Sequence, residues 1–282
     1  SVTSLGTLDD AQGKVVYDGS AAQVMAANTY YDLQLNNSAG ASLSGNVTVN
    51  GTLTLGNGDL TSSSTKKLTV KSSTSGGNDN GHIVGPFNYS STTTNEVILH
   101  VGDGLGVHPI KIEPVSATAQ TYGIEHFNGS PGYTIDNSDG LQYVNNTYYY
   151  DISRSGSVNA YLSLPLSGLN SVTLTDLCIG HYTYSNRWER VAPTSTPPNM
   201  NDYVRGLITS FSPFTVGSNG LPLGDDPLIN VSGSLSLFDT CFGLATSAQV
   251  LQVSGQDLVS PITVNAPTGY ELSKTASGTY TN

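Results

Sequence analysis

Short runs of alternating apolar and polar residues recur through the first hundred residues of the chain. They lie at residues 15–17, 33–35, 53–55 and 68–70, and their centres, at residues 16, 34, 54 and 69, are 18, 20 and 15 residues apart. Alternation turns one face of each strand inward, and this spacing is close to one coil of a β-solenoid. The pattern therefore favours a stack of β-coils over residues 1–81.

Residue pairs that tolerate positive φ at tight corners separate these runs: they are Asn36-Asn37, Asn50-Gly51 and Asn57-Gly58. Because Asn-Gly is also the strongest short hairpin signal, a meander or sandwich of regular hairpins is the alternative to the solenoid. A further strand is expected at residues 47–49.

The pattern changes after the polar segment 72–81, which reads SSTSGGNDNG. Longer strand candidates then follow at irregular spacing, which is typical of a β-sandwich. These candidates are residues 96–101, 107–112, 147–152, 160–164 and 172–177. The sequence therefore predicts a β-sandwich over residues 82–219.

A third part begins near residue 220, where the segment GLPLGDDP has the composition of a linker. Strand candidates follow at residues 234–237, 248–253 and 261–264. They are too few to close an immunoglobulin-like sandwich, so residues 220–282 are predicted to be a linker and a partial Ig-like domain. The fold class expected for the whole chain is all-β.

The net charge of the chain limits the kinds of molecule that it can bind. Only 11% of the 282 residues are charged, and 21 acidic against 10 basic residues give a net charge of −11. A nucleic acid would be repelled, and no apolar run is long enough to span a bilayer. Ser1 begins without a signal sequence, so any export signal is expected to have been removed. Cys178 and Cys241 are expected to be buried free thiols rather than a disulfide, and they leave the compartment open.

Four stretches in order resemble the large surface proteins exported by the type IX secretion system, including gliding and attachment adhesins. They are YYDLQLNNSAGASLSGNVTVNGTLTLGNGDL at 30–60, GHIVGPFNYSSTTTNEVILHVGDGLGVHPIKI at 81–112, ITSFSPFTVGS at 208–218, and SLSLFDTCFGLATSAQVLQVSGQDLVSPITVNAPTGYELS at 234–273. His100 stands where proline is usual in the second stretch. The resemblance implies export across the outer membrane and a role in adhesion, filament or matrix formation. It supplies no catalytic residues.

No catalytic constellation stands out. The five histidines have no metal-ligand spacing, and the sequence has no nucleophile elbow and no P-loop. A solenoid that cleaves acidic polysaccharides would need a basic, calcium-assisted groove, and only Lys14, Lys66, Lys67 and Lys71 are candidates for it. We therefore expect no enzyme and no required cofactor.

Two small sites are candidates. Asp136, Asn137 and Asp139 precede a glycine, and closely spaced carboxylate and amide oxygens of this kind can hold calcium, although the closing glutamate of a calcium loop is missing. The alternative is an Asx-rich surface turn. Asp225-Asp226 is a weaker calcium candidate in the linker, with a solvated hinge as its alternative.

Tyr148 and Tyr150 are candidates for stacking on a sugar ring, because aromatic faces bind carbohydrate. Alternation sends Tyr149 to the opposite face, so at least one of the three tyrosines is expected in the core. Trp188, the single tryptophan, is expected to anchor the core or an edge of the sandwich.

The leading hypothesis is a non-catalytic extracellular structural or adhesive module of a secreted bacterial surface protein. An incomplete Ig-like unit exposes strand edges, which a strand from a neighbouring subunit could complete to build a filament. An arbitrary chain boundary is the other explanation for the same incompleteness. The alternative function is a glycan-binding accessory module of a surface polysaccharide-processing protein.

Overall fold

The computed structural model describes residues 6, 8–132, 134–166, 169, 176–194, 203–220, 223, 228–239, 246–256, 261–274 and 278. The chain divides into two compact units, residues 1–224 and residues 225–282. Strands dominate the described residues, and none of those residues forms a helix long and apolar enough to cross a membrane. The predicted all-β class is confirmed.

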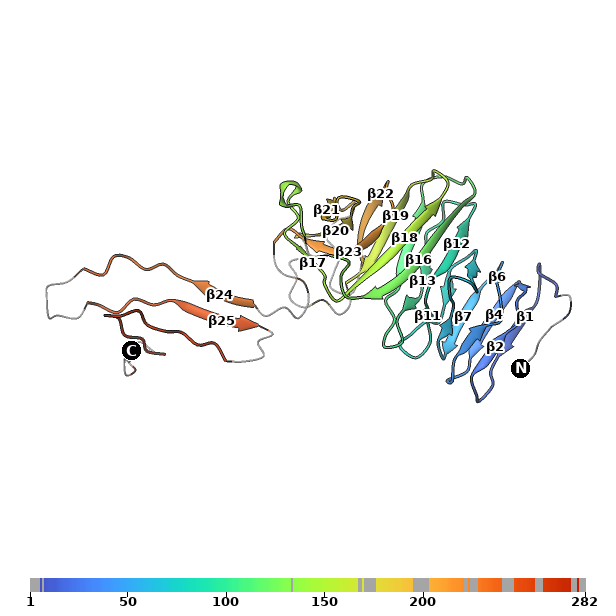
Figure 1. The fold of residues 1–282 in the computed structure, drawn as a ribbon, viewed down its shortest axis with the longest axis horizontal. Helices are drawn as coiled ribbons and strands as arrows, with labels where there is room; N and C mark the ends of the chain where they lie inside the picture. Colours follow the sequence, from blue (N-terminus) through green and yellow to red (C-terminus); the bar gives the residue numbers. More distant parts are fainter. Residues whose placement is uncertain are drawn as a thin grey trace. The chain divides into compact units, whose positions relative to one another are not determined.

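The first unit begins with a parallel β-solenoid of about five turns, whose three faces are three sheets (Figure 1). The first sheet contains β1 (Lys14–Tyr17), β4 (Asp32–Asn36), β7 (Leu53–Asn57) and β10 (Thr74–Ser75). The second contains β2 (Gln23–Met25), β5 (Ala41–Leu43), β8 (Leu60–Thr61), β11 (Ile83–Val84) and β14 (Val101–Gly102). The third begins with β3 (Thr29–Tyr30), β6 (Val47–Val49), β9 (Leu68–Val70) and β12 (Phe87–Ser91). The predicted solenoid is therefore confirmed, and these strands do not form a meander of hairpins.

Alternating side chains build the solenoid core. Leu33 pairs with Leu53 and Leu35 with Leu55 in parallel register, and all four side chains are 0–1% exposed. Each buried leucine contributes roughly 1.5–3 kcal/mol relative to an exposed one. The stacked leucines thus hold successive coils together.

One of the three predicted spacings joins strands of different faces. β9 pairs with β6 in the third sheet, whereas the strand that follows β7 in the first sheet is β10. Thr74 lies beside Leu53, so the coil here is 21 residues long, not 15. The run at residues 68–70 has the same alternation as the run at 53–55, and alternation alone does not say which face of the solenoid a strand occupies.

The solenoid continues into antiparallel sheets without a break at residue 81. β12 pairs in parallel with β9 and antiparallel with β16 (Gln120–Asn128), so one ten-stranded sheet spans both regions. It is completed by β17 (Tyr143–Val144), β18 (Tyr148–Ser155), β20 (Leu177–Tyr182), β21 (Trp188–Val191) and β23 (Pro213–Ser218). No boundary between residues 81 and 82 interrupts the contacts of the first unit.

A separate antiparallel sheet contains β13 (Val97–Leu99), β15 (Ile110–Pro114), β19 (Ala160–Pro165) and β22 (Tyr203–Ile208). Buried residues of this sheet, of the ten-stranded sheet and of the solenoid belong to one hydrophobic cluster. Strand candidates at 96–101, 107–112, 147–152 and 160–164 overlap β13, β15, β18 and β19, whereas most of 172–177 lies outside the described residues. A sandwich topology for this region stays a prediction.

Among the described residues of the second unit, β24 (Leu228–Ser232) and β25 (Gln252–Gln256) form an antiparallel pair. The expected strands at 234–237 and 261–264 form no ladder, although Ser236 hydrogen-bonds to the side chain of Gln249. None of the described side chains of this unit is buried. The Ig-like assignment stays a prediction.

Candidate functional site

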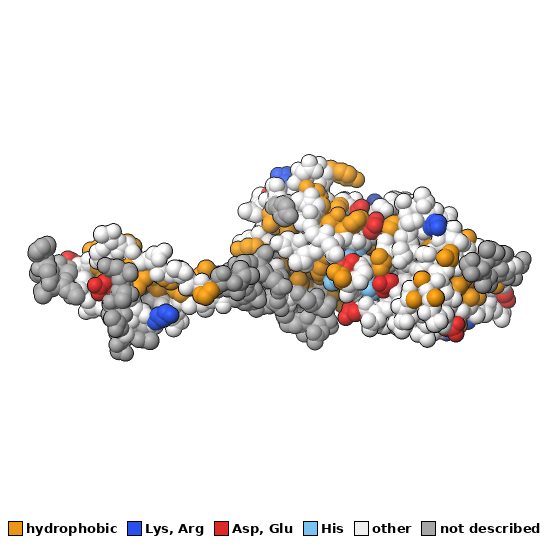
Figure 2. Space-filling model, turned by 60° about the horizontal axis from the view of Figure 1, so that its bottom comes forward, with side chains coloured by type: hydrophobic (Ala, Val, Ile, Leu, Met, Phe, Trp, Pro, Cys, Tyr) orange, Lys and Arg blue, Asp and Glu red, His pale blue; other side chains and the backbone are white. Residues whose placement is uncertain are grey.

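Three of the five histidines gather with three aspartates where the solenoid meets the antiparallel sheets. His82 precedes β11, His108 lies in the loop between β14 and β15, and His126 lies on β16. Asp59, Asp79 and Asp103 surround them. On one face of the molecule histidine side chains appear beside acidic ones (Figure 2). The other two histidines have separate partners, Thr74 for His100 and Ser212 for His181.

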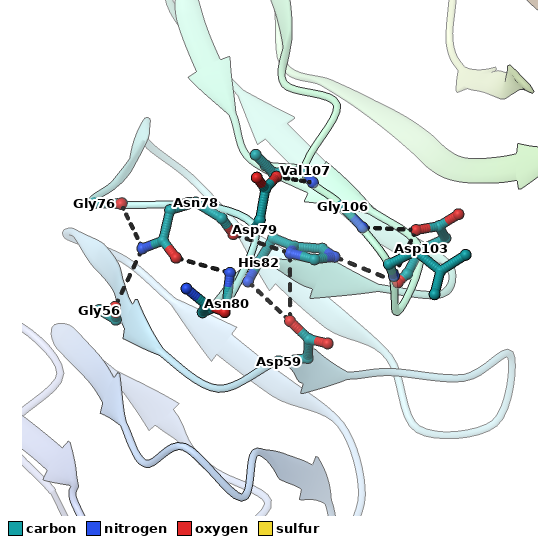
Figure 3. A network of polar contacts seen from close by, with 11 residues as sticks. Gly56, Asp59, Gly76, Asn78, Asp79, Asn80, His82, Asp103, Gly106 and Val107 are labelled. Atoms are coloured by element: carbon teal, nitrogen blue, oxygen red, sulfur yellow. Dashed lines mark hydrogen bonds and ion pairs between the residues drawn. The ribbon is translucent and has the colours of Figure 1, made fainter. Parts of the chain in front are cut away.

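A tight turn before β11 positions His82 (Figure 3). Asn78 and Gly81 exchange backbone hydrogen bonds of 3.1 and 2.9 Å, and the Asn78 side chain donates to Gly56 O of the preceding coil at 3.2 Å. The His82 ring is fully buried, with Nδ1 3.1 Å from Asn78 O and 3.3 Å from Asp59 Oδ1. Its Nε2 lies 3.4 Å from Asp103 O. Both ring nitrogens therefore face acceptors on three successive coils.

Two carboxylates fix the loop that carries His108. Asp79 Oδ1 accepts a hydrogen bond from Val107 N at 3.1 Å, and Asp103 Oδ1 accepts from Leu105 N and Gly106 N at 2.8 and 3.0 Å (Figure 3). Burial acts to raise the pKa of Asp103, but these backbone donors and the Asn128 side chain outweigh it and lower the pKa. The carboxylate is thus ionised at neutral pH and holds the loop.

An aromatic stack lies beside this loop. The rings of His108 and His126 are 4.7 Å apart and 5° from parallel, and the Tyr148 ring lies 4.5 Å from His108 and 5.5 Å from His126. Tyr150 meets His126 edge-on at 5.3 Å and donates its hydroxyl to His108 O at 3.1 Å. Four side chains thus join the loop to β16 and β18.

Both stacked histidines are neutral at pH 7. His126 is only 6% exposed, and burial, reinforced by His108, lowers its pKa to about 4. Burial also lowers the pKa of His108. His108 Nδ1 and both ring nitrogens of His126 are buried and have no hydrogen-bond partner among the described residues. Such a group can take up a proton, but nothing near it in the described part of the chain is placed as a nucleophile for it to activate.

Sequence reasoning missed this cluster, although one signal was present. His82 follows Asp59 by 23 residues and precedes Asp103 by 21, so the three residues recur at about the length of one coil. A solenoid register places such residues side by side. His126 gave no comparable signal, because it comes from an antiparallel strand.

The calcium candidates form a hydrogen-bonded turn. Asn137–Asp139 is a short 3₁₀ turn, η1; Asp136 Oδ1 accepts from Ser138 N and Oγ, and Asp136 Oδ2 lies 3.3 Å from Arg187. Asp139 accepts hydrogen bonds from the backbone N–H groups of Leu141 and Arg190. This is the geometry of the Asx-rich turn that was the alternative. Calcium binding here stays a prediction, as it does at Asp225-Asp226, which lies outside the described residues.

The structure buries both candidate sugar-stacking tyrosines. Tyr148 is 5% exposed and Tyr150 0%, whereas Tyr149 lies half-buried on the opposite face and stacks on Phe127. The predicted alternation is therefore seen, but the pair presents no exposed aromatic platform, because its face of β18 packs into the core. Burial raises the pKa of Tyr148 to about 12.

Trp188 is fully buried in a small second cluster and donates its indole N–H to Gly132 O at 2.9 Å, which confirms the expected anchor. Cys178 is a free thiol in the same cluster, as expected. Cys241 lies outside the described residues.

The described part of the chain holds no group of three or more histidine, cysteine or acidic side chains placed to bind a metal ion. Comparison with known proteins finds no matching family model, no matching curated protein and no matching solved structure. The fold defines the class, an all-β protein built on a parallel solenoid. Function must therefore be argued from the chain itself.

Proposed function

We propose that this chain is a non-catalytic, extracellular structural or adhesive module of a secreted bacterial surface protein, and that its second unit joins copies of the chain by strand exchange. The observation that supports this most is the uncovered apolar face of the β24–β25 pair. The sequence resemblance to exported adhesins favours the same role.

Apolar side chains lie on one face of that pair. Val231 is directly opposite Val253 in the ladder, and with Ile229 and Leu251 they are 38–60% exposed. Ser232, Gln252 and Ser254 occupy alternate positions and so lie on the opposite face. An isolated two-stranded sheet is marginally stable in water, so this pair gains stability from any strand that extends or covers it.

A second copy of the chain suits this face. The chain carries a net charge of −11, which repels like chains at most surfaces. β24 and β25, with sequences LINVS and QVSGQ, contain no charged residue. Copies can therefore meet at these strands without placing like charges together, and their free edges can pair by backbone hydrogen bonds.

Sedimentation velocity over a wide range of protein concentration tests the proposal. The native chain should form dimers or longer assemblies, and Val231→Asp should return it to monomer because the substitution puts a charge in the apolar face that assembly would bury. Ser254→Asp is the matched control, since it adds the same charge to the polar face and should leave assembly unchanged. A native chain that stays monomeric at its highest soluble concentration would contradict strand exchange between copies.

The glycan-binding alternative was motivated by Tyr148 and Tyr150. Their burial removes that motivation, and no other described feature favours it.

A further inference from the structure

Four aromatic side chains link the loop that follows β14 to the antiparallel strands β16 and β18. The loop 103–109 leaves β14, and its His108 lies flat against His126 of β16. From β18, Tyr148 packs on both rings, and the Tyr150 hydroxyl bonds to the backbone of the loop. The stack therefore holds the loop against β16 and β18, while Asp79 and Asp103 fix its internal conformation.

A positive charge in the stack would be poorly solvated. Three ring nitrogens of the two histidines are buried without a hydrogen-bond partner among the described residues, so protonation of a ring would add an N–H donor that has no acceptor within hydrogen-bond distance. A proton on one ring would also lie against the face of a second imidazole 4.7 Å away. A buried, unpaired cation is far more costly than a neutral ring.

The surrounding charged groups do not compensate for it. Asp103 acts on both histidines and Asp79 acts on His108, and these carboxylates favour the charged forms, but each already accepts backbone hydrogen bonds from the loop. His82 acts on both in the opposite sense. The two tyrosines that touch the stack, Tyr148 and Tyr150, are neutral at any pH near neutrality.

We propose that the His108–His126 stack is an acid-sensitive latch, which holds the loop 103–109 against β16 and β18 at neutral pH and releases it when the medium acidifies. This is independent of whether copies of the chain exchange strands. A surface protein built this way would free this loop on entering an acidic compartment, while the continuous sheet through β9, β12 and β16 stays paired.

The direction of the pH effect on loop opening follows from proton linkage. The folded pKa of His126, about 4, lies below the ordinary value of 6.5, so the opened loop binds protons more readily than the closed one between these two pH values. The closed state is therefore most favoured above pH 6.5 and loses stability progressively as the pH falls toward 4. Opening should be local, because the leucine stack of the solenoid contains no titrating group.

Amide hydrogen exchange of the full chain at pH 7 and pH 5, corrected for the intrinsic pH dependence of exchange, measures the latch. The amide of His108, which donates to Val101 O at 2.7 Å, should lose protection by about tenfold or more, since one pK unit of linkage is a factor of ten. The amides of β4 and β7 should keep their protection from exchange at both pH values. A chelator in the buffer excludes a metal effect.

His126→Phe is the decisive variant, because it keeps a stacked ring and removes the more deeply buried of the two histidines, whose pKa is lowered to about 4. Its loop should stay protected at pH 5. His181→Phe is the matched control, because His181 is also buried and its ring is stacked 4.7 Å from that of Phe214, away from the latch. In this variant the loop 103–109 should still lose protection at pH 5. If His126→Phe does not fold, Tyr150→Phe serves instead, since loss of its bond to the loop should move opening to higher pH. Equal protection of the native loop at both pH values, or acid opening that persists in His126→Phe, overturns the latch.

Discussion

Gly58 occupies a corner where two coils of the solenoid touch, and an added methyl group there has nowhere to go. Its φ is +82°, and a Cβ built on it would lie 1.7 Å from Asn37 O and 2.8 Å from Gly40 N. Both atoms belong to the backbone of the preceding coil, so no side-chain rotation relieves the overlap. Gly58→Ala should therefore force the two coils apart at this corner.

The loss of stability in Gly58→Ala can be estimated from the contacts at this corner. The left-handed conformation alone costs a non-glycine residue about 1 kcal/mol. The separation also strains the hydrogen bonds from Asn37 N to Asn57 O and from Ala41 N to Asp59 O, both 2.9 Å, which are worth about 1 kcal/mol each. With packing strain included, we expect Gly58→Ala to lower the free energy of unfolding of the first unit by about 3–5 kcal/mol.

Gly13→Ala distinguishes the cost of the left-handed backbone conformation from the cost of steric overlap with a neighbouring coil. Gly13 has a similar φ of +90°, but no atom lies within 4 Å of its built Cβ. This variant should lose only about 1 kcal/mol, the conformational part alone. Urea unfolding followed by the fluorescence of Trp188, the single tryptophan, reports the first unit in both proteins. Equal losses in the two variants would refute the close approach of the coils at Gly58.

Three further results are expected from the same structure. Asn37→Ala should lower the free energy of unfolding by about 2 kcal/mol, because the buried amide bonds to two acceptors of the first coil; Asn36→Ala, at an exposed neighbour, should be nearly neutral in the same urea titration. Trp188→Phe should lower the thermal midpoint measured by circular dichroism, because it leaves the Gly132 carbonyl without its indole donor and a cavity where the fully buried indole was. In a Cys241→Ala background, Cys178 should not react with a thiol reagent at pH 8 until urea is added, because burial raises its pKa to about 11.

The tyrosines of β18 show what alternation can and cannot predict. The order Tyr148-Tyr149-Tyr150 requires the middle ring to face away from the other two, and it does. The sequence could not say which face would be covered, because that depends on pairing with β16 and β23, strands that come from about 25 residues before and 65 after in the chain. For this reason the structure places both candidate sugar-stacking rings in the core, and sugar binding by them stays a prediction.

The sequence by itself determined the all-β class, the solenoid coils and the alternation within each strand, because strand geometry and corner residues act over a few neighbours. Only the tertiary structure decided that β9 joins β6 and not β7, and that His126 of an antiparallel strand lies against His108 of the last coil. Such pairings depend on closing loops of many residues and on which faces fit together, and no local pattern records that choice. The histidine stack is therefore a property of the fold, although each of its residues was visible from the start.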